Sequence, residues 1–230
     1  MPVFLSKTIK FFVAILLLPI LPAVAMGIWN RAGELNARLL FLENPLSLCF
    51  SGFVIWGIFA LLFQFPARVY VAAHELTHAL FVKLCGGRVK KIAVRGRSGY
   101  VLSDRANFLI ALAPYLFPFY AVVWSVLGLA TIFFLPFFRW QVVFWVGFGF
   151  CVGYHWTMTA RMLTTRQTDF SSQGYFFSFV MIITANLTLL LFILLLLPDP
   201  RRFPDQITAL GADTLQFYKK TFQILRKLDP

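Results

Sequence analysis

The sequence predicts an all-α polytopic membrane protein with five to six transmembrane helices and one short β-hairpin. Hydrophobic residues make up 60% of the 230 positions and charged residues only 13%, which is about half the charged fraction of a typical soluble domain. Several uncharged stretches reach the length of about 20 residues that an α-helix needs to cross a bilayer. We therefore expect an integral-membrane domain over 1–198 and a separate tail over 199–230.

The first two expected spans cover about 9–29 and 44–66, where charged residues are almost absent. The sequence Ala-Val-Ala at 23–25 resembles a signal-peptide cleavage site, so removal of this segment is the alternative. We favour an uncleaved span because the uncharged stretch continues to Asn30. The next apolar segment, 67–85, is expected either to span the membrane or to re-enter on the same face.

Three further spans are expected over about 106–136, 140–162 and 170–198. The first of these contains prolines, which remove backbone hydrogen bonds and interrupt helices, so we expect a kinked or broken span. The prolines are Pro114, Pro118 and Pro136. The tail over 199–230 is polar and basic, and its apolar pattern over 208–228 predicts an amphipathic helix that lies on the membrane surface.

A strongly basic segment follows the 67–85 helix. Between Lys83 and Arg105 there are seven basic residues and one acidic residue. Partial alternation of apolar and polar residues around a glycine-containing turn predicts a β-hairpin over 88–102, and a solvated basic loop is the alternative. Because the positive-inside rule is most reliable over short loops, this segment favours a cytoplasmic position for the neighbouring helix end.

The net charge of the chain is +12. Its basic residues border apolar stretches, so anionic lipid headgroups explain them better than nucleic acid does. The sequence has no recognition motif for DNA or RNA, and we expect no nucleic-acid partner. The expected partners are the lipid bilayer and a membrane protein substrate, and the expected location is a bacterial inner (plasma) membrane, crossed several times.

The 67–85 segment contains His74-Glu75-Leu76-Thr77-His78, a His-Glu-x-x-His motif that uses two of the three histidines of the chain. On a helix, His74 and His78 point the same way, so both imidazoles can bind one zinc ion. Glu75 is displaced by about 100° around the helix, where its carboxylate can serve as general base for a water molecule. The alternative is a pair of core histidines with Glu75 in an ion pair.

A catalytic zinc usually has three protein ligands, and two residues are candidates for the third. The chain crosses the membrane twice between 86 and 165, so His155 and Asp169 lie on the same side of the bilayer as the motif. The alternative roles are a helix N-cap for Asp169 and an interhelical hydrogen bond for His155. Spacing alone does not separate the two candidates.

The motif at 74–78, the glycines at 86–87 with a basic hairpin after them, and a late Asp beside an apolar segment together resemble the site-2 protease family of intramembrane zinc metalloproteases. The resemblance covers roughly 71–191. It implies that Asp169 is the third metal ligand and that the hairpin presents or gates substrate. The Leu-Asp-Gly and Asn-Pro elements usual in that family are absent here, so the resemblance implies a divergent branch in which His155 stabilises the oxyanion.

The expected function is therefore intramembrane zinc-dependent hydrolysis of peptide bonds in membrane-embedded or membrane-proximal proteins. His74, His78 and Asp169 would hold Zn²⁺, with Glu75 and His155 as catalytic residues. Water must reach this site, so we expect a polar cavity near Thr77, His155 and Thr159. The alternatives are a non-catalytic membrane scaffold or assembly subunit with a protease-like fold, and a small transporter with a proton relay.

Overall fold

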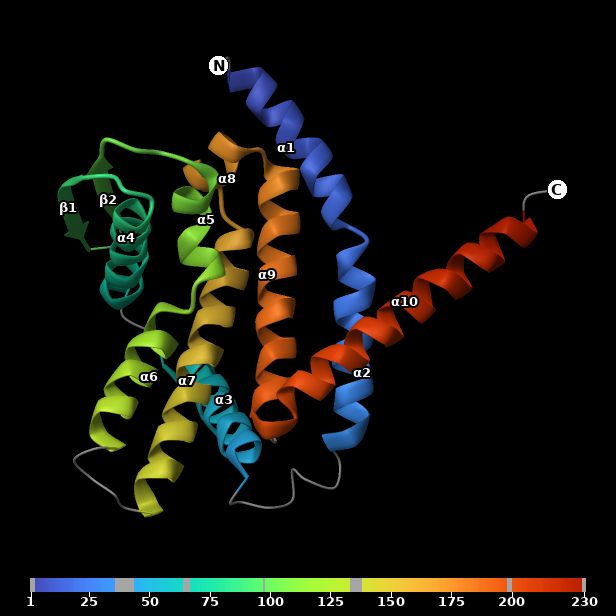
Figure 1. Cartoon of the computed structure of the whole chain (residues 1–230). Coiled ribbons are helices and arrows are strands. Elements are labelled where there is room, and N and C mark those ends of the chain that lie inside the picture. The colour runs from blue at the N-terminus through green and yellow to red at the C-terminus, as the bar shows by residue number, and fades with distance from the viewer. Residues whose placement is uncertain are drawn as a thin grey trace.

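The computed structural model describes residues 3–35, 44–63, 67–96, 98–132, 138–197 and 200–228, and these residues are mostly helical (Figure 1). Long helices α2, α7 and α9 run in similar directions and form the body of the molecule, with the hairpin and α8 near one end. The elements are α1 (Val3–Leu17), α2 (Ile20–Leu35), α3 (Pro45–Leu62), α4 (Ala67–Leu84), β1 (Val89–Arg95), β2 (Ser98–Ser103), α5 (Phe108–Leu116), α6 (Phe119–Ile132), α7 (Phe138–Leu163), α8 (Thr168–Gln173), α9 (Tyr175–Leu196), η1 (Pro200–Arg202) and α10 (Phe203–Leu228).

Three helical segments are long and apolar enough to cross a membrane: Lys7–Ala32, Pro45–Leu62 and Tyr175–Leu196. A fourth is possible if α5 and α6 form one bent span. These segments confirm the predicted membrane character and correspond to the spans expected over 9–29, 44–66 and 170–198. Helices α4 and α7 are less apolar and are not among them.

The break predicted within the 106–136 segment is present. Helices α5 and α6 meet at an angle of 69°, and Pro118 lies at the break between them. Pro114 lies inside α5, while Pro136 is outside the described residues. The prolines explain the break because each lacks the N–H that would continue the helical hydrogen-bond pattern.

The close packing of α3 against α7 depends on glycine. A Cβ atom added at Gly52 would overlap the backbone of Val146, and one added at Gly149 would overlap the backbone of Cys49. Small residues at such positions allow two helix backbones to approach closely, as is common between membrane helices. The indole of Trp56, fully buried, donates a hydrogen bond of 2.8 Å to Thr157 across the same pair of helices.

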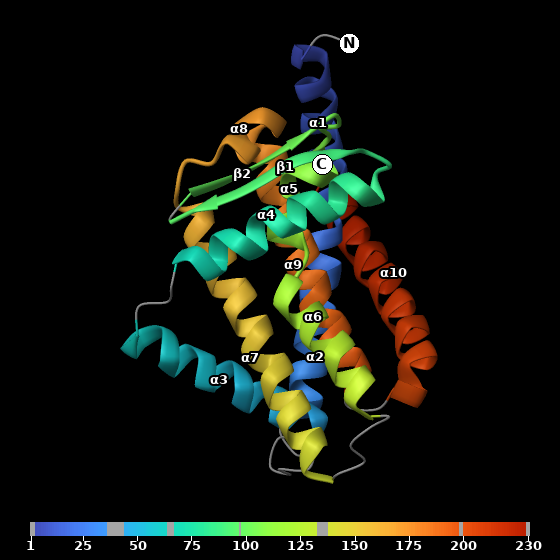
Figure 2. The same cartoon turned by 90° about the vertical axis from the view of Figure 1, so that its left-hand side faces the viewer.

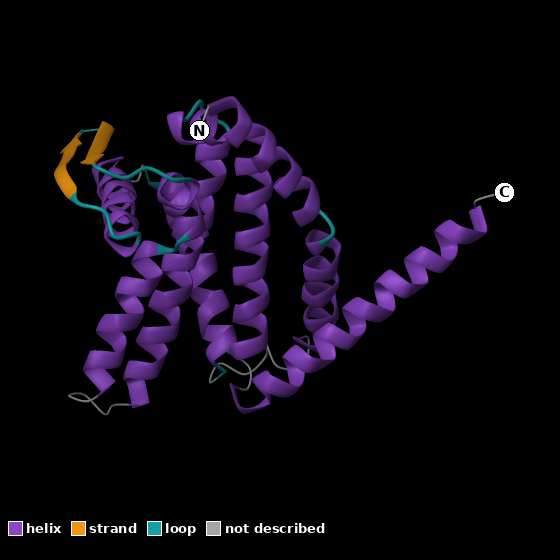
Figure 3. Ribbon diagram, turned by 45° about the horizontal axis from the view of Figure 1, so that its top comes forward, coloured by secondary structure: helices purple, strands orange, loops and turns teal. Residues whose placement is uncertain are grey.

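The predicted hairpin is confirmed. Strands β1 and β2 pair in antiparallel register, with Ile92 opposite Val101 and Val94 opposite Gly99. Gly96 adopts a positive φ of 60° in the turn, a conformation that glycine accepts without a Cβ clash. Figure 3 shows the two strands beside α4 at one edge of the helical body.

Helix α4 lies across the body of the molecule. In Figure 2 its axis is steeply inclined to α6 and α7, and the two strands lie along it. A membrane span parallel to its neighbours was one of the two arrangements expected for 67–85. The inclined axis agrees better with the other arrangement, a re-entrant segment that does not pass straight through the body.

Helix α10 leaves the body at the end opposite the hairpin and extends away from it (Figure 1). Leu210, Phe217 and Ile224 recur every seven residues and so lie on one face of α10, while Lys219 and Arg226 lie on the opposite face. This is the amphipathic pattern expected for the tail. Its position on a membrane surface stays a prediction.

Candidate metal centre

Two ligand candidates come from one face of α4. His74 and His78 are one helical turn apart, and their Nε2 atoms lie 3.1 Å from each other. The two rings are nearly perpendicular, with an interplanar angle of 83°. The local sequence explains this arrangement because residues four apart on an α-helix lie above one another on the same face.

The third candidate, Asp169, comes from the short helix α8. Its Oδ2 atom is 3.5 Å from His74 Nε2 and 3.6 Å from His78 Nε2. The alternative role as helix N-cap does not apply, because Gln167 occupies that position. Among the described residues, His74, His78 and Asp169 are the group of His, Cys, Asp and Glu side chains whose atoms, all within 4.8 Å, could hold a metal ion.

The three atoms form a triangle with sides of 3.1, 3.5 and 3.6 Å. Zinc bonds to imidazole nitrogen and carboxylate oxygen are about 2.0–2.2 Å long, so two ligand atoms of a tetrahedral zinc lie about 3.4 Å apart. The triangle therefore has the size of one face of a zinc tetrahedron. An ion bound there would have its fourth position open, as in catalytic zinc sites.

Hydrogen bonds outside the triangle fix the orientation of each ligand. His78 Nδ1 lies 2.8 Å from the carbonyl oxygen of Ile110, and since a carbonyl only accepts, Nδ1 carries the proton and Nε2 presents a lone pair. His74 Nδ1 lies 3.2 Å from the hydroxyl of Tyr70, and Tyr115 donates a 2.9 Å hydrogen bond to Asp169 Oδ2. Such outer contacts are typical of metal-binding histidines and carboxylates.

The Asp169 carboxylate is held in its ionised form. Burial disfavours the charge, but hydrogen bonds and charge interactions with His74 and His78 outweigh it and lower the pKa of this carboxyl. A divalent cation at this position would stabilise the carboxylate in the same way, because it supplies positive charge beside both imidazoles.

Glu75 lies on a different face of α4, beneath strand β2. Its residue exposure is only 6%, and a Cβ added at Gly99 would come within 2.6 Å of Glu75 Cγ and 2.7 Å of its Oε1. The hairpin therefore covers the predicted general base directly. Gly99 is needed at this point because any side chain there would displace the Glu75 carboxylate.

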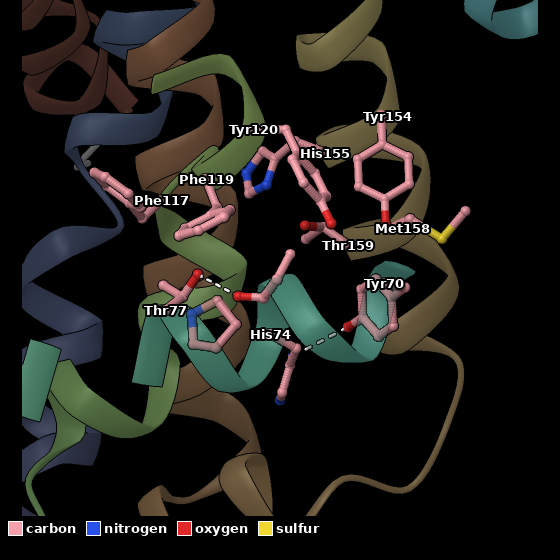
Figure 4. A pocket seen from close by; sticks show the side chains of 12 residues that line it. Tyr70, His74, Thr77, Phe117, Phe119, Tyr120, Tyr154, His155, Met158 and Thr159 are labelled. Atoms are coloured by element: carbon pink, nitrogen blue, oxygen red, sulfur yellow. Dashed lines mark hydrogen bonds between the residues drawn. The ribbon is translucent and has the colours of Figure 1, made fainter. Parts of the chain in front are cut away.

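His155 is outside the ligand group. It is buried at 7% exposure in α7, and within the described parts of the chain its Nε2 has no hydrogen-bond partner. The structure thus brings Asp169, and not His155, to the two histidines of the motif. Figure 4 shows His155 across a cavity from Thr77, with the ring of His74 turned away from it.

That cavity is the one expected from the sequence. It has a volume of about 20 Å³ and is lined in part by Thr77, His155 and Thr159. This is enough room for one water molecule. It also touches His74, so it lies beside the candidate metal ligands.

Sequence reasoning did not find Tyr70, Ile110 and Tyr115, which contact the ligands. Tyr70 precedes His74 by one helical turn, so helical spacing could have indicated its contact with the His74 ring. The Ile110 contact uses a backbone carbonyl, which leaves no side-chain signal.

Comparisons with protein-family models, curated proteins and solved structures find no match to this chain. Fold and site together define a helical membrane protein with a candidate His-His-Asp metal centre.

Proposed function

We propose that the protein is an intramembrane zinc metalloprotease that hydrolyses peptide bonds of membrane-embedded or membrane-proximal proteins. The observation that carries the proposal is the triangle of His74 Nε2, His78 Nε2 and Asp169 Oδ2, with sides of 3.1–3.6 Å. The resemblance of the 74–78 motif and its following hairpin to site-2 proteases supports it, with Asp169 in a divergent sequence context.

A zinc ion at this site would polarise the scissile carbonyl and acidify a water molecule. Glu75 takes a proton from the attacking water as the new C–O bond forms. It then delivers that proton to the leaving amine as the C–N bond breaks, so one carboxylate acts first as base and then as acid. Its position one residue after His74, on an adjacent face of α4, supports this role.

His155 is proposed to stabilise the negative charge that develops on the carbonyl oxygen. Its buried Nε2 and its place in the cavity that also touches His74 support this assignment. A donor already fixed in a buried site stabilises such charge more than water does. The same cavity offers a place for the water that hydrolysis consumes.

Access to Glu75 requires movement of the hairpin, because β2 covers this side chain. We propose that a substrate displaces or pairs with the strands before cleavage, a mode in which an extended peptide adds to an open strand edge. We also propose five to six membrane crossings, with α7 as a span and α4 as a span or re-entrant helix, in a bacterial inner membrane.

The cover over Glu75 also supports a second candidate function, a non-catalytic membrane scaffold that retains the metal centre. A reporter membrane protein incubated with purified enzyme separates the two. Cleavage by the wild type that falls by about 10²–10⁴-fold in Glu75→Gln, the range for loss of a general base, supports the protease. Glu75→Gln should keep its metal. If the metal-loaded wild type and Glu75→Gln both process the reporter only at background level, the result supports the scaffold function.

A further inference from the structure

The carbonyl that holds His78 is made available by a proline. In an α-helix the carbonyl of one residue accepts the N–H of the residue four positions later. For Ile110 that later residue is Pro114, which lies inside α5 and has no N–H. The position normally taken by this helical donor is therefore open, and His78 Nδ1 lies there at 2.8 Å.

Both polar groups of the Ile110 backbone are held from outside the helical pattern. The Ile110 N–H donates a 2.8 Å hydrogen bond to the side chain of Asn107, which caps α5. Its carbonyl accepts from His78, and Ile110 itself is buried at 7% exposure. A buried carbonyl is almost always paired. Pro114 leaves the Ile110 carbonyl without its helical donor, and His78 supplies a donor in its place.

The residue after the proline contacts a second ligand. Tyr115, fully buried, donates its hydroxyl to Asp169 Oδ2 at 2.9 Å, and its ring packs against that of His74 at a centroid distance of 5.3 Å. One short stretch of α5 thus contacts all three members of the metal centre, through a backbone carbonyl, a hydroxyl and an aromatic ring.

We propose that Pro114 is a positioning residue of the metal centre: it keeps the Ile110 carbonyl free to accept the His78 Nδ1 proton, which fixes Nε2 of His78 as the metal-binding atom. The proposal rests on the proposed function, since it assigns a role within the same metal site. A residue with an N–H at 114 would compete with His78 for this carbonyl and release the imidazole to other orientations.

The test compares Pro114→Ala with Pro118→Ala in the full chain purified in detergent. Alanine at 114 restores the N–H and suits a helix. The control residue, Pro118, lies at the break between α5 and α6, and its carbonyl accepts from the N–H of Val122. Pro118→Ala therefore removes a nearby proline without freeing a donor toward the Ile110 carbonyl. Zinc affinity is measured by competition with a chelator, and circular dichroism checks folding. Pro114→Ala should bind zinc about 10–100-fold more weakly, the usual effect of losing an outer contact, and Pro118→Ala within about twofold of wild type.

Nitrogen NMR of histidine-labelled, zinc-loaded wild type gives a second readout that needs no variant. Only three histidines are present, and His78→Gln identifies the signals of His78. A protonated Nδ1 and a metal-bound Nε2 on His78 are expected, with faster exchange of that Nδ1 proton in Pro114→Ala.

Equal zinc affinity in Pro114→Ala and Pro118→Ala, or an unprotonated Nδ1 on His78, would overturn the role of Pro114 while leaving the metal site intact. A folded wild type that binds no zinc would instead overturn the proposed function.

Discussion

Helix α4 has a ligand face, which carries His74 and His78, and a cavity face, where Thr77 and His155 of α7 line the same cavity, and the polar groups gathered at the two faces differ in how completely they are paired. On the ligand face, both ring nitrogens of His74 and His78 have a polar neighbour within 3.2 Å. On the cavity face, Thr77 bonds back to its own helix, and the facing His155 Nε2 has no partner in the described residues. The ligand face is organised in advance for a cation, whereas the cavity face leaves a polar group for a small molecule such as water.

Under the proposed function, this difference would let one part of the site hold the metal rigidly while another part meets the reacting molecules. Ligands whose outer contacts are fixed lose little further freedom on binding a metal. A group inside a small cavity can instead meet a molecule that changes during the reaction.

Replacing a ligand should remove the metal, and replacing the cavity histidine should not. Asp169→Ala loses an oxygen placed 3.5–3.6 Å from both imidazoles, so bound zinc should fall to background in elemental analysis. His155→Ala is the comparison variant, because His155 is buried near the site but lies outside the triangle, and it should retain zinc while losing cleavage. Retention of zinc by Asp169→Ala together with its loss in His155→Ala would reverse the two assignments.

Removing an outer contact should weaken the metal site without abolishing it. Tyr115→Phe deletes the hydroxyl that donates to Asp169, and zinc affinity should fall about 10–100-fold in chelator competition. Tyr120→Phe serves as control, because that hydroxyl donates at 2.7 Å to the backbone of Val69 and contacts no ligand. Equal affinities in the two variants would mean that the outer shell does not organise the ligand face.

Crowding the hairpin should affect Glu75 and leave the ligands unchanged. Gly99→Ala places a Cβ within 2.8 Å of Glu75 and Val71, and overpacking of this kind costs about 1–3 kcal/mol. Hydrogen exchange over 89–103 should therefore accelerate and cleavage should fall, with zinc affinity unchanged. Gly57→Ala is the control because its added Cβ meets nothing within 4 Å. Loss of zinc in Gly99→Ala would show that the hairpin supports the ligands as well.

Much of this arrangement could be predicted from the sequence. The spacing of His74 and His78 predicted two candidate ligands because four residues make about one helical turn, and the structure places their Nε2 atoms 3.1 Å apart. The basic segment with its glycine turn located the hairpin within a residue at each end. The expected membrane crossings, which stay a prediction, left Asp169 and His155 as candidates for the third ligand, and only the fold separates the two residues.

Other features left little trace in the sequence. The crossing orientation of α4 depends on contacts with α5 and the strands, which hydrophobic periodicity does not record. Pro114 predicted a kink, but its connection to His78 requires knowing that α4 passes beside the Ile110 carbonyl. The cover of β2 over Glu75 depends likewise on tertiary packing at Gly99, a position that reads in the sequence only as part of a turn.

X-ray absorption at the zinc edge of the purified protein shows directly whether His74, His78 and Asp169 bind zinc. A bound zinc with two imidazole nitrogens and a carboxylate oxygen at about 2.0–2.2 Å is the predicted result. The chain also has three free cysteines, Cys49, Cys85 and Cys151, which would give a different signal if they bound the metal. A sulfur shell at about 2.3 Å, or the absence of zinc from folded protein supplied with it, would rule out a zinc site formed by His74, His78 and Asp169.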